Sequence, residues 1–258
     1  MLTYDVARAW IDRWDRQQEG YIPDREERFT VLIDAVEAGV GRPDPLVIDL
    51  GCGPGSLAVR LLQRLPRATV IAVDADPVLL ALGRAAYGDV PGLSFVDLDL
   101  RTPDWSARLS VDRLADAAVS TTALHWLPEP HLRAVYKELA TVLRPGGLFL
   151  DGDHLGADER ATPTLARLER AVCEYEERRR FAEGRPEDWR AWWDAATADP
   201  ALAEAVALRA ERSDDGGHGS AETLRLDSHV SALRDAGFAE IGTLWQHGDN
   251  RLLCAIRS

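Results

Sequence analysis

The residues best suited to chemistry lie in the stretch 47–57, where an apolar segment passes through glycines at alternate positions into a helical pattern. Gly51, Gly53 and Gly55 permit backbone conformations with positive φ and let a ligand approach the main chain closely. The start of the following helix offers free N–H groups and a partial positive charge. The stretch therefore predicts a strand, a tight turn and a helix start that together bind a small molecule.

Acidic residues follow the next two expected strands, at the strand ends where open α/β sheets bind ligands. The carboxylate of Asp74 could accept hydrogen bonds from both hydroxyls of a ribose. In the run Asp97-Leu98-Asp99-Leu100, one carboxylate could receive an exocyclic amine. Because alternate residues of an extended chain point the same way, the residues alone do not decide between Asp97 and Asp99.

Histidines near the ends of the fourth and fifth expected strands are the candidate catalytic residues. His125 and His154 could each act as a general base or form a hydrogen bond with a substrate. The alternatives are that Trp126 packs His125 at a loop and that His154 simply precedes a helix. A metal site at His154 with Asp153 is the weaker option, since the sequence shows no second cluster of ligands, and we expect no metal.

Aromatic residues on both sides of the central segment could form an apolar substrate pocket, although each alone is also compatible with ordinary packing. The substrate-binding candidates, with one histidine from the start of the last expected helix, are Tyr21, Trp126, Trp192, His229 and Trp245. His218 lies in the glycine- and aspartate-rich segment 213–220, which predicts a mobile loop that leaves this histidine solvated.

The elements that must position these residues alternate between apolar strands and amphipathic helices, a pattern typical of an α/β fold with a doubly wound, mostly parallel sheet. A turn is expected at 144–147, before the fifth strand. The expected strands are 46–50, 69–73, 93–96, 115–120 and 148–150, followed by a hairpin of 241–246 and 251–256. The expected segments are a helical N-terminal cap at 1–43, a core at 44–153, a helical insertion over the substrate at 154–225, and the last helix and strands at 226–258.

Composition narrows the classes of protein to which the chain could belong. Its 258 residues carry a formal net charge of -13, which argues against general binding to nucleic acid or to an anionic membrane. The sequence shows no apolar run long enough to span a bilayer and no signal peptide, so we expect a cytoplasmic protein, monomeric or homodimeric. Its cysteines are far apart and predict free thiols, and Cys52 fits a need for a small residue in the glycine turn.

A dinucleotide site is the first alternative for the glycine turn, because its fingerprint is G-x-G-x-x-G. Gly51 and Gly53 fit this spacing, but Ser56 occupies the third glycine position and Gly55 falls one residue early. The turn therefore fits a ligand without a pyrophosphate better than it fits a dinucleotide.

The ordered segments VIDLGCGPGS, VIAVDADP, SFVDLDL, DAAVSTTALHWLPEP and LRPGGLFL resemble those of class I S-adenosylmethionine-dependent methyltransferases over residues 44–153. The terminal hairpin also suits the last two strands of that family. The resemblance implies a Rossmann-like sheet of seven strands with an antiparallel terminal strand and helical cap insertions. It implies transfer of a methyl group from S-adenosylmethionine to O, N or C of a small molecule, with aromatic and carboxylate-bearing acceptors as candidates.

The resemblance also implies roles for residues by position. The glycines of the turn border the methionine part of the cofactor, Asp74 binds the ribose, and Asp99 with Leu100 matches the adenine-binding pair better than Asp97 with Leu98. The full set of cofactor candidates is Asp49, Gly51, Cys52, Gly53, Gly55, Asp74, Ala75, Asp97, Leu98, Asp99, Leu100 and Thr121. For Asp49 the alternative is that it supports the glycine turn.

Other functions remain open from the sequence alone. One is a protein that binds S-adenosylmethionine without transferring its methyl group, and another is a nicotinamide-dependent oxidoreductase. RNA methylation is disfavoured by the acidic net charge and the absence of a basic appendage.

Overall fold

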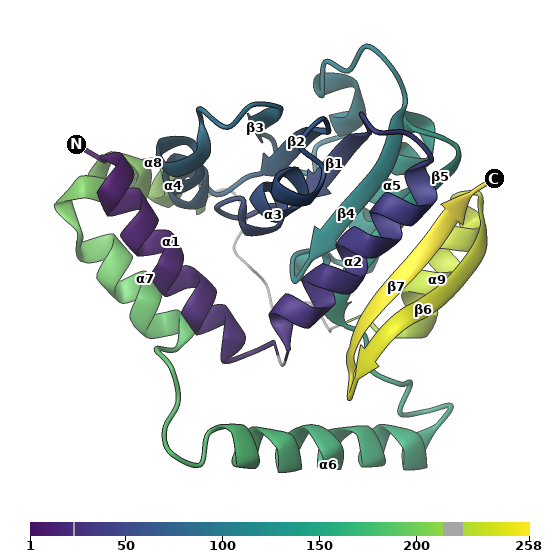
Figure 1. The fold of residues 1–258 in the computed structure, drawn as a ribbon. Coiled ribbons are helices and arrows are strands. Elements are labelled where there is room, and N and C mark those ends of the chain that lie inside the picture. Colours follow the sequence, from purple (N-terminus) through teal and green to yellow (C-terminus); the bar gives the residue numbers. More distant parts are fainter. Residues whose placement is uncertain (23, 214–223) are drawn as a thin grey trace.

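The computed structural model describes residues 1–22, 24–213 and 224–258, and these residues contain a seven-stranded sheet in the order β3-β2-β1-β4-β5-β7-β6 (Figure 1). The first five strands pair in parallel, whereas β7 runs antiparallel to both β5 and β6. The strands are β1 (Leu46–Leu50), β2 (Thr69–Asp74), β3 (Leu93–Asp97), β4 (Ala115–Thr121), β5 (Leu143–His154), β6 (Phe238–His247) and β7 (Asn250–Arg257). This topology confirms the predicted doubly wound sheet with a terminal antiparallel hairpin.

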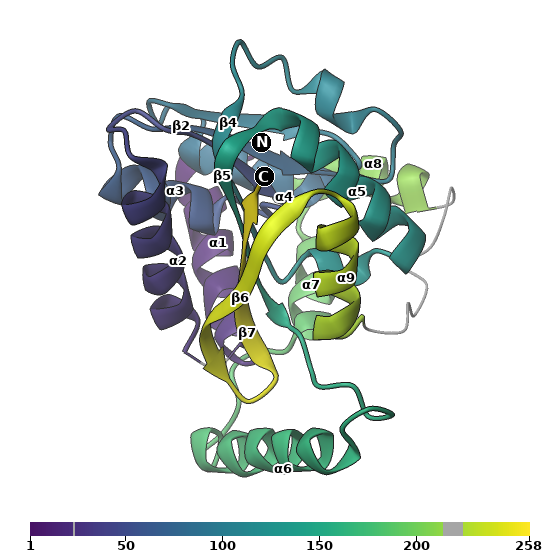
Figure 2. The same ribbon diagram turned by 90° about the vertical axis from the view of Figure 1, so that its right-hand side faces the viewer.

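Helices cover both faces of the sheet, with α2 and α3 on one face and α5 and α9 on the other (Figure 2). The remaining large helices α1, α4, α7 and α8 pack together beside the β3 end of the sheet (Figure 1). The helices are α1 (Tyr4–Glu19), α2 (Arg25–Val40), α3 (Ser56–Arg64), α4 (Pro77–Tyr87), α5 (Glu129–Val142), α6 (Pro163–Arg180), α7 (Trp189–Ala198), α8 (Ala203–Ser213) and α9 (Leu226–Asp235), with short 3-10 turns η1 (Trp105–Arg108), η2 (Leu124–Trp126) and η3 (Pro200–Leu202).

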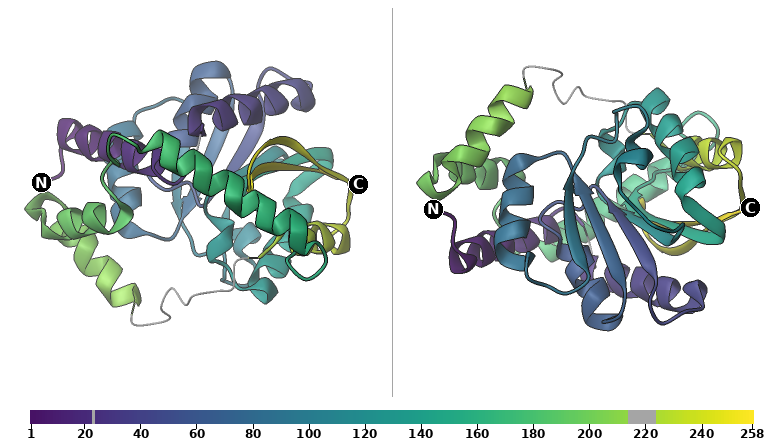
Figure 3. Two further views of the ribbon diagram at one scale, coloured as in Figure 1. Left: turned by 90° about the horizontal axis from the view of Figure 1, so that it is seen from below. Right: turned by 90° about the horizontal axis from the view of Figure 1, so that it is seen from above.

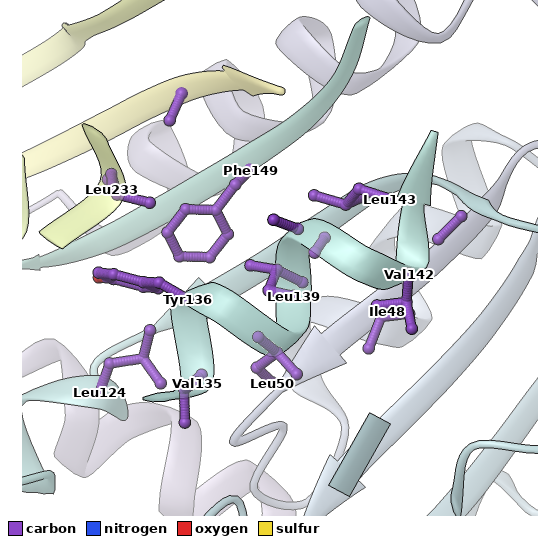
Figure 4. Packing of buried hydrophobic residues seen from close by; sticks show 14 of the residues in the cluster. Ile48, Leu50, Leu124, Val135, Tyr136, Leu139, Val142, Leu143, Phe149 and Leu233 are labelled. Atoms are coloured by element: carbon purple, nitrogen blue, oxygen red, sulfur yellow. The ribbon is translucent and has the colours of Figure 1, made fainter. Parts of the chain in front are cut away.

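Apolar side chains from both faces of the central strands form the core. On the face covered by α5, Ile48 and Leu50 pack with Leu139, Tyr136 and Phe149, all fully buried (Figure 4). Because the central parallel strands are buried on both faces, they read as almost continuous apolar runs rather than alternating ones. Burial of this kind is the main stabilising contribution to the fold, and it fixes the strand ends that carry the polar residues of the site.

The fifth strand differs from its prediction, because it begins at Leu143 rather than at Leu148. Leu143 pairs with Ala115 and Leu148 with Ala117, so the expected turn 144–147 is a bulge within the strand. Gly146 has φ of +70°, a conformation that favours glycine. The predicted turn chemistry is therefore present, but the ladder continues on both sides of it.

Helices joined by loops make up most of the segments outside the core where the structure describes them. Residues 1–43 contain α1 and α2, and residues 154–225 contain α6, α7 and α8. Helix α6 stands apart from the sheet and crosses the underside of the molecule (Figure 3, left), and its Leu165, Leu168 and Val172 are exposed. Of the predicted loop 213–220, Ser213 ends α8, while the rest, including His218, lies outside the described residues.

Membrane spans were sought among the helices of residues 1–22, 24–213 and 224–258. None of those helices combines the length and the apolar character that crossing a bilayer requires.

Candidate functional site

The glycine turn lines a cavity of about 410 Å³ at the carboxyl ends of the parallel strands. Gly51, Cys52 and Gly53 form part of its wall. Gly51 has φ of +69°, and a Cβ atom there would lie 2.3 Å from the Cβ atom of Ala123. Gly55, with φ of +88°, precedes α3 and does not line this cavity. The turn therefore needs glycine for its conformation and, at Gly51, also for space.

Asp74 lies at the end of β2 and lines the same cavity. Its carboxylate accepts hydrogen bonds from the backbone N–H groups of Gly53, at 2.7 Å, and Asp76, at 2.8 Å. Burial raises the pKa of Asp74 to about 6, although these backbone hydrogen bonds oppose the rise. The carboxylate is therefore mostly ionised at neutral pH and remains a strong acceptor.

Asp49 and Cys52 are buried beside the turn, and their environments disfavour ionisation. Asp49 does not line the cavity, and both its oxygens are buried without a hydrogen-bond partner among the described residues. Burial and the charge of Asp74 raise its pKa to about 8. Burial, Asp74 and Asp49 raise the pKa of the Cys52 thiol well above its usual range, so this thiol is poorly suited to act as a nucleophile.

This buried carboxyl predicts a pH-dependent cost in stability. In the unfolded chain Asp49 ionises above pH 4, but in the fold it keeps its proton until about pH 8. The free energy of unfolding should therefore fall over this range, and Asp49→Asn should remove that part of the slope. We expect the variant's advantage to grow by about 1.4 kcal/mol per pH unit between the two pKa values, reaching roughly 5 kcal/mol at pH 8, measured by denaturant unfolding. An equal difference at every pH would contradict the assignment, and Asp194→Asn on the exposed side of α7 is the control.

Helix α8 covers the strand end at which adenine binding was predicted. Arg212 donates to both oxygens of Asp97 and to the carbonyl of Ala75, each at 2.8 Å. Asp99 pairs with Arg101 at 2.7 Å. None of the residues 97–100, nor Ala75, lines the cavity, and Leu98 is buried in the core. Both carboxylates thus have an arginine partner, and the choice between them stays a prediction.

Arg209 of α8 is a cavity residue that the sequence did not reveal. Its Nε atom lies 2.6 Å from the carboxylate of Asp76, and its guanidinium lies 3.9 Å from the ring centroid of Trp193. The chain separation of 133 residues between Arg209 and Asp76 explains why no local pattern pointed to this contact. Together these residues close the β2 side of the cavity.

Aromatic side chains continue the cavity wall from Trp193. The ring centroids of Trp126 and Trp189 are 6.5 Å apart, and those of Trp189 and Trp193 are 5.8 Å apart. Tyr21 accepts a hydrogen bond from the backbone of Trp189 at 2.9 Å and lines the cavity as well. The structure thus brings the predicted substrate residues Tyr21 and Trp126 together with α7, around a space of the size that small-molecule sites have.

Three predicted substrate residues lie elsewhere. Trp192 is fully buried against Trp10, with ring centroids 5.4 Å apart, in the core of the helical caps. His229 is fully buried and lies 2.7 Å from the hydroxyl of Tyr136, and burial lowers its pKa to about 4. Trp245 of β6 donates to a carboxylate of α2. None of these three residues reaches the cavity. Trp192 and His229 pack in the interior, and Trp245 points away toward α2.

His125 and Asp153 form a hydrogen-bonded pair at the carboxyl ends of β4 and β5. The Nδ1 atom of His125 lies 2.8 and 2.9 Å from the two oxygens of Asp153. Burial alone would raise the pKa of Asp153, but the hydrogen bond and charge of His125, together with His154, bring it to about 2. An ionised carboxylate at Nδ1 favours the tautomer in which Nε2 carries the lone pair, which is the state required of a base.

Thr121 and Thr122 join β4 to the turn that carries His125, and both line the cavity. Thr122 has φ of +50°, in the left-handed region that few threonines adopt, and its N–H donates to the carbonyl of Gly152 at 2.9 Å. Backbone strain of this kind is often found where a loop must place functional groups.

A second cavity of about 640 Å³ meets the first one. It extends beneath α6, and the two cavities share Tyr21, His125 and His154. His154 lies 3.5 Å from the carboxylate of Asp249; burial would lower its pKa, but Asp249 and Asp153 raise it. The two predicted catalytic histidines are therefore the residues at which the cavities join.

Comparisons with known proteins agree with this architecture. Residues 47–147 match the family model described as a methyltransferase domain. The chain is 33% identical over 136 residues to the trans-aconitate 2-methyltransferase of Azoarcus sp. (strain BH72), a match that covers 53% of this chain and 49% of that protein. It therefore spans about half the length of this curated relative.

Solved structures show the same fold. An O-methyltransferase family protein from Burkholderia thailandensis superposes with a TM-score of 0.56 at 21% identity, covering 97% of this chain and 70% of that one. Human N-acetylserotonin methyltransferase, solved in complex with its S-adenosylmethionine ligand, superposes with a TM-score of 0.52 at 17% identity, covering 89% and 51%.

The sheet order and the glycine turn define a Rossmann-like α/β domain with a cavity at the strand ends, where open α/β sheets bind their ligands. Within it, residues 47–147 match the methyltransferase domain that the ordered motifs predicted. This match favours S-adenosylmethionine over a nicotinamide as the expected ligand.

Proposed function

We propose that the protein transfers a methyl group from S-adenosylmethionine to a small molecule whose nucleophile carries a proton, with His125 as the general base. The observation that supports this most directly is the His125–Asp153 pair, at the junction of two cavities. When bound, S-adenosylmethionine supplies a methyl group on a sulfonium, which leaves as S-adenosylhomocysteine. The protein must hold the acceptor in line, exclude water and remove the acceptor's proton.

The first cavity has the features that this cofactor requires. Gly51 and Gly53 present bare backbone, and Asp74 presents an ionised carboxylate for a ribose. Arg209 and Trp193 close the adjoining wall. We assign the cofactor to this cavity and the body of the acceptor to the second one, so that the reacting atoms lie near the shared residues.

His125 is better suited than His154 to be the base. Asp153 is ionised and holds Nδ1 of His125, which leaves Nε2 to accept the acceptor's proton and pass it to water. The raised pKa of His154 favours its protonated form, which instead suits a hydrogen bond to an acceptor oxygen. The two histidines therefore take different roles in the proposal.

The acceptor is proposed to be an aromatic hydroxyl or amine. Tyr21, Trp126 and Trp189 offer flat apolar surface beside the base. The arginines of the described residues that line either cavity all face a carboxylate, within 4.0 Å: Arg25, Arg170, Arg180, Arg185, Arg209 and Arg225. A multiply charged acid would have to compete with these carboxylates for its cation partners.

A carboxylate acceptor is the second candidate, because the curated relative is named a trans-aconitate methyltransferase. A carboxylate is already ionised at neutral pH and needs no base, so this chemistry would leave the His125–Asp153 pair without a role in proton transfer.

The experiment that tests the proposed function is methyl transfer with isotope-labelled S-adenosylmethionine. Acceptors are matched aromatic rings that carry a hydroxyl, an amine or a carboxylate at the same position, with S-adenosylhomocysteine binding measured by calorimetry in parallel. We expect labelled product from the hydroxyl or amine compound. Tight S-adenosylhomocysteine binding without labelled product from these rings or from a metabolite extract would instead favour a binding protein without transfer.

Removal of the Asp74 carboxylate should weaken cofactor binding. We expect Asp74→Ala to weaken S-adenosylhomocysteine binding by about 1.5–3 kcal/mol, through lost charge-assisted hydrogen bonds. Isothermal calorimetry measures the effect, and Asp89→Ala at an exposed site is the control. Asp74→Ala also removes the hydrogen bond from Gly53, and thermal unfolding of the unliganded variant measures what that bond contributes to stability. Unchanged affinity for S-adenosylhomocysteine would contradict the assignment.

A further inference from the structure

Arg28 of α2 is a fully buried cation that contacts no carboxylate within the part of the chain that the structure describes. Its Nη1 donates to the side-chain oxygen of Asn250 and its Nη2 to the hydroxyl of Thr121, both at 2.5 Å, while its Nε has no hydrogen bond. Both acceptors are neutral. Burial of a charge is costly unless an opposite charge or a functional need balances it, so this position calls for an explanation.

The guanidinium packs directly against β5 at Gly152. A Cβ atom at Gly152 would lie 2.9 Å from Nε of Arg28, so only glycine leaves room for it. Because side chains alternate along a strand, Asp151 and Asp153 project from the opposite face of β5. Arg28 thus faces the carboxylate that holds His125, with the backbone of one strand between them.

The same side chain joins the two histidine-bearing parts of the site. Thr121 ends β4, directly before the turn that carries His125. Asn250 begins β7, directly after Asp249, which is the partner of His154. One buried side chain therefore connects the supports of both histidines.

We propose that Arg28 is a positioning residue that fixes the ends of β4 and β7 and supplies a permanent positive charge across β5 from Asp153, the carboxylate that holds His125. The inference rests on the proposed role of His125. Although burial lowers the pKa of Arg28 to about 10, and Asp153 and Asp151 oppose this, the group remains charged at neutral pH. The Arg28 guanidinium is therefore a permanent positive charge on the side of β5 opposite Asp153.

Other charged and titratable groups surround this centre from each neighbouring element. They are Asp151 and His154 of β5, Arg25 of α2, Tyr136 of α5, His229 of α9 and Asp249 of the hairpin. Burial and the charge of Asp153 raise the pKa of Asp151 well above its usual range, and burial lowers that of His229 to about 4, so His229 is neutral near pH 7. His154 faces Asp249 and Arg25 faces Asp15. Asp153 is thus the carboxylate that links the two groups, to Arg28 through charge and to His125 through a hydrogen bond.

The test follows the protonation of the His125 ring by NMR in the full-length protein with S-adenosylhomocysteine, using labelled histidine and a His125→Asn variant for assignment. In Arg28→Met, loss of the positive charge should move the titration midpoint upward by about 0.5–1 pH unit. Arg28→Lys should keep the midpoint within about 0.2 pH unit, since the charge stays. Arg28→Lys should still lower kcat several-fold, because an ammonium group cannot donate to Thr121 and Asn250 in the fixed geometry of the planar guanidinium.

Arg64→Met is the matched control, because Arg64 pairs with acidic residues of α2 at the surface. If Arg28→Met does not fold, Gly152→Ala tests the same point by pushing the guanidinium aside, and it should also raise the midpoint. An unchanged midpoint in whichever of these two variants is folded overturns the inference. Failure of methyl transfer with a shifted midpoint would instead count against the proposed function alone.

Discussion

Replacement of His125 by alanine is expected to lower kcat/KM for a hydroxyl acceptor by about 10²–10⁴-fold, the usual contribution of a positioned general base. The reason is geometric: Asp153 holds Nδ1 at 2.8 Å, so the ring presents Nε2 in one orientation. Affinity for S-adenosylhomocysteine should change far less, because the proposed cofactor contacts belong to the glycine turn and Asp74. Initial rates with labelled cofactor measure the loss, and calorimetry measures the affinity.

Two comparisons make this result specific. His131→Ala removes an exposed histidine from the start of α5 and should leave the rate unchanged. Asp153→Asn keeps the shape of the pair but removes the charge that orients the ring, and it should reduce the hydroxyl reaction as well. A carboxylate acceptor that reacts equally well with the wild type and His125→Ala would show that no base is needed, and it would move the function to the second candidate.

The sequence predicted the core because local chemistry determines it. Apolar runs, alternate glycines and strand-end acids place β1 to β4 and the cavity wall at Gly51, Gly53 and Asp74 without information from distant parts of the chain. Strand-end reasoning also placed His125 and His154 at the carboxyl ends of β4 and β5, where the structure has them.

The parts that the sequence did not predict depend on contacts between distant segments. Arg209 meets Asp76 across 133 residues, and Arg28 meets Asn250 across 222 residues. No pattern within α2 shows that the turn carrying Arg28 faces the edge of the sheet. Trp192 was predicted as a substrate residue because its neighbours are aromatic, yet that same neighbourhood is a packed core of tryptophans.

The last result expected to be large concerns Gly51. Gly51→Ala should destabilise the fold by about 2–5 kcal/mol and reduce S-adenosylhomocysteine binding severely, because two costs act at one position. Left-handed backbone costs a residue with a Cβ atom about 1–2 kcal/mol. In addition, the new Cβ would lie 2.3 Å from that of Ala123, and relief of such a clash in a packed region costs about 1–3 kcal/mol.

The clash has a functional consequence that strain alone would not have, because Ala123 directly precedes the η2 turn that carries His125. Gly41→Ala separates the two costs: its φ of +67° is nearly the same, but no atom lies within 4 Å of the added Cβ. We therefore expect Gly41→Ala to show only the smaller loss in denaturant unfolding, with unchanged cofactor affinity. Ala123→Gly added to Gly51→Ala should restore part of both stability and binding, since it removes the clashing methyl group. If the double variant is no better than Gly51→Ala, strain rather than the contact with Ala123 limits the turn, and the coupling between the glycine turn and the His125 turn would have to be abandoned.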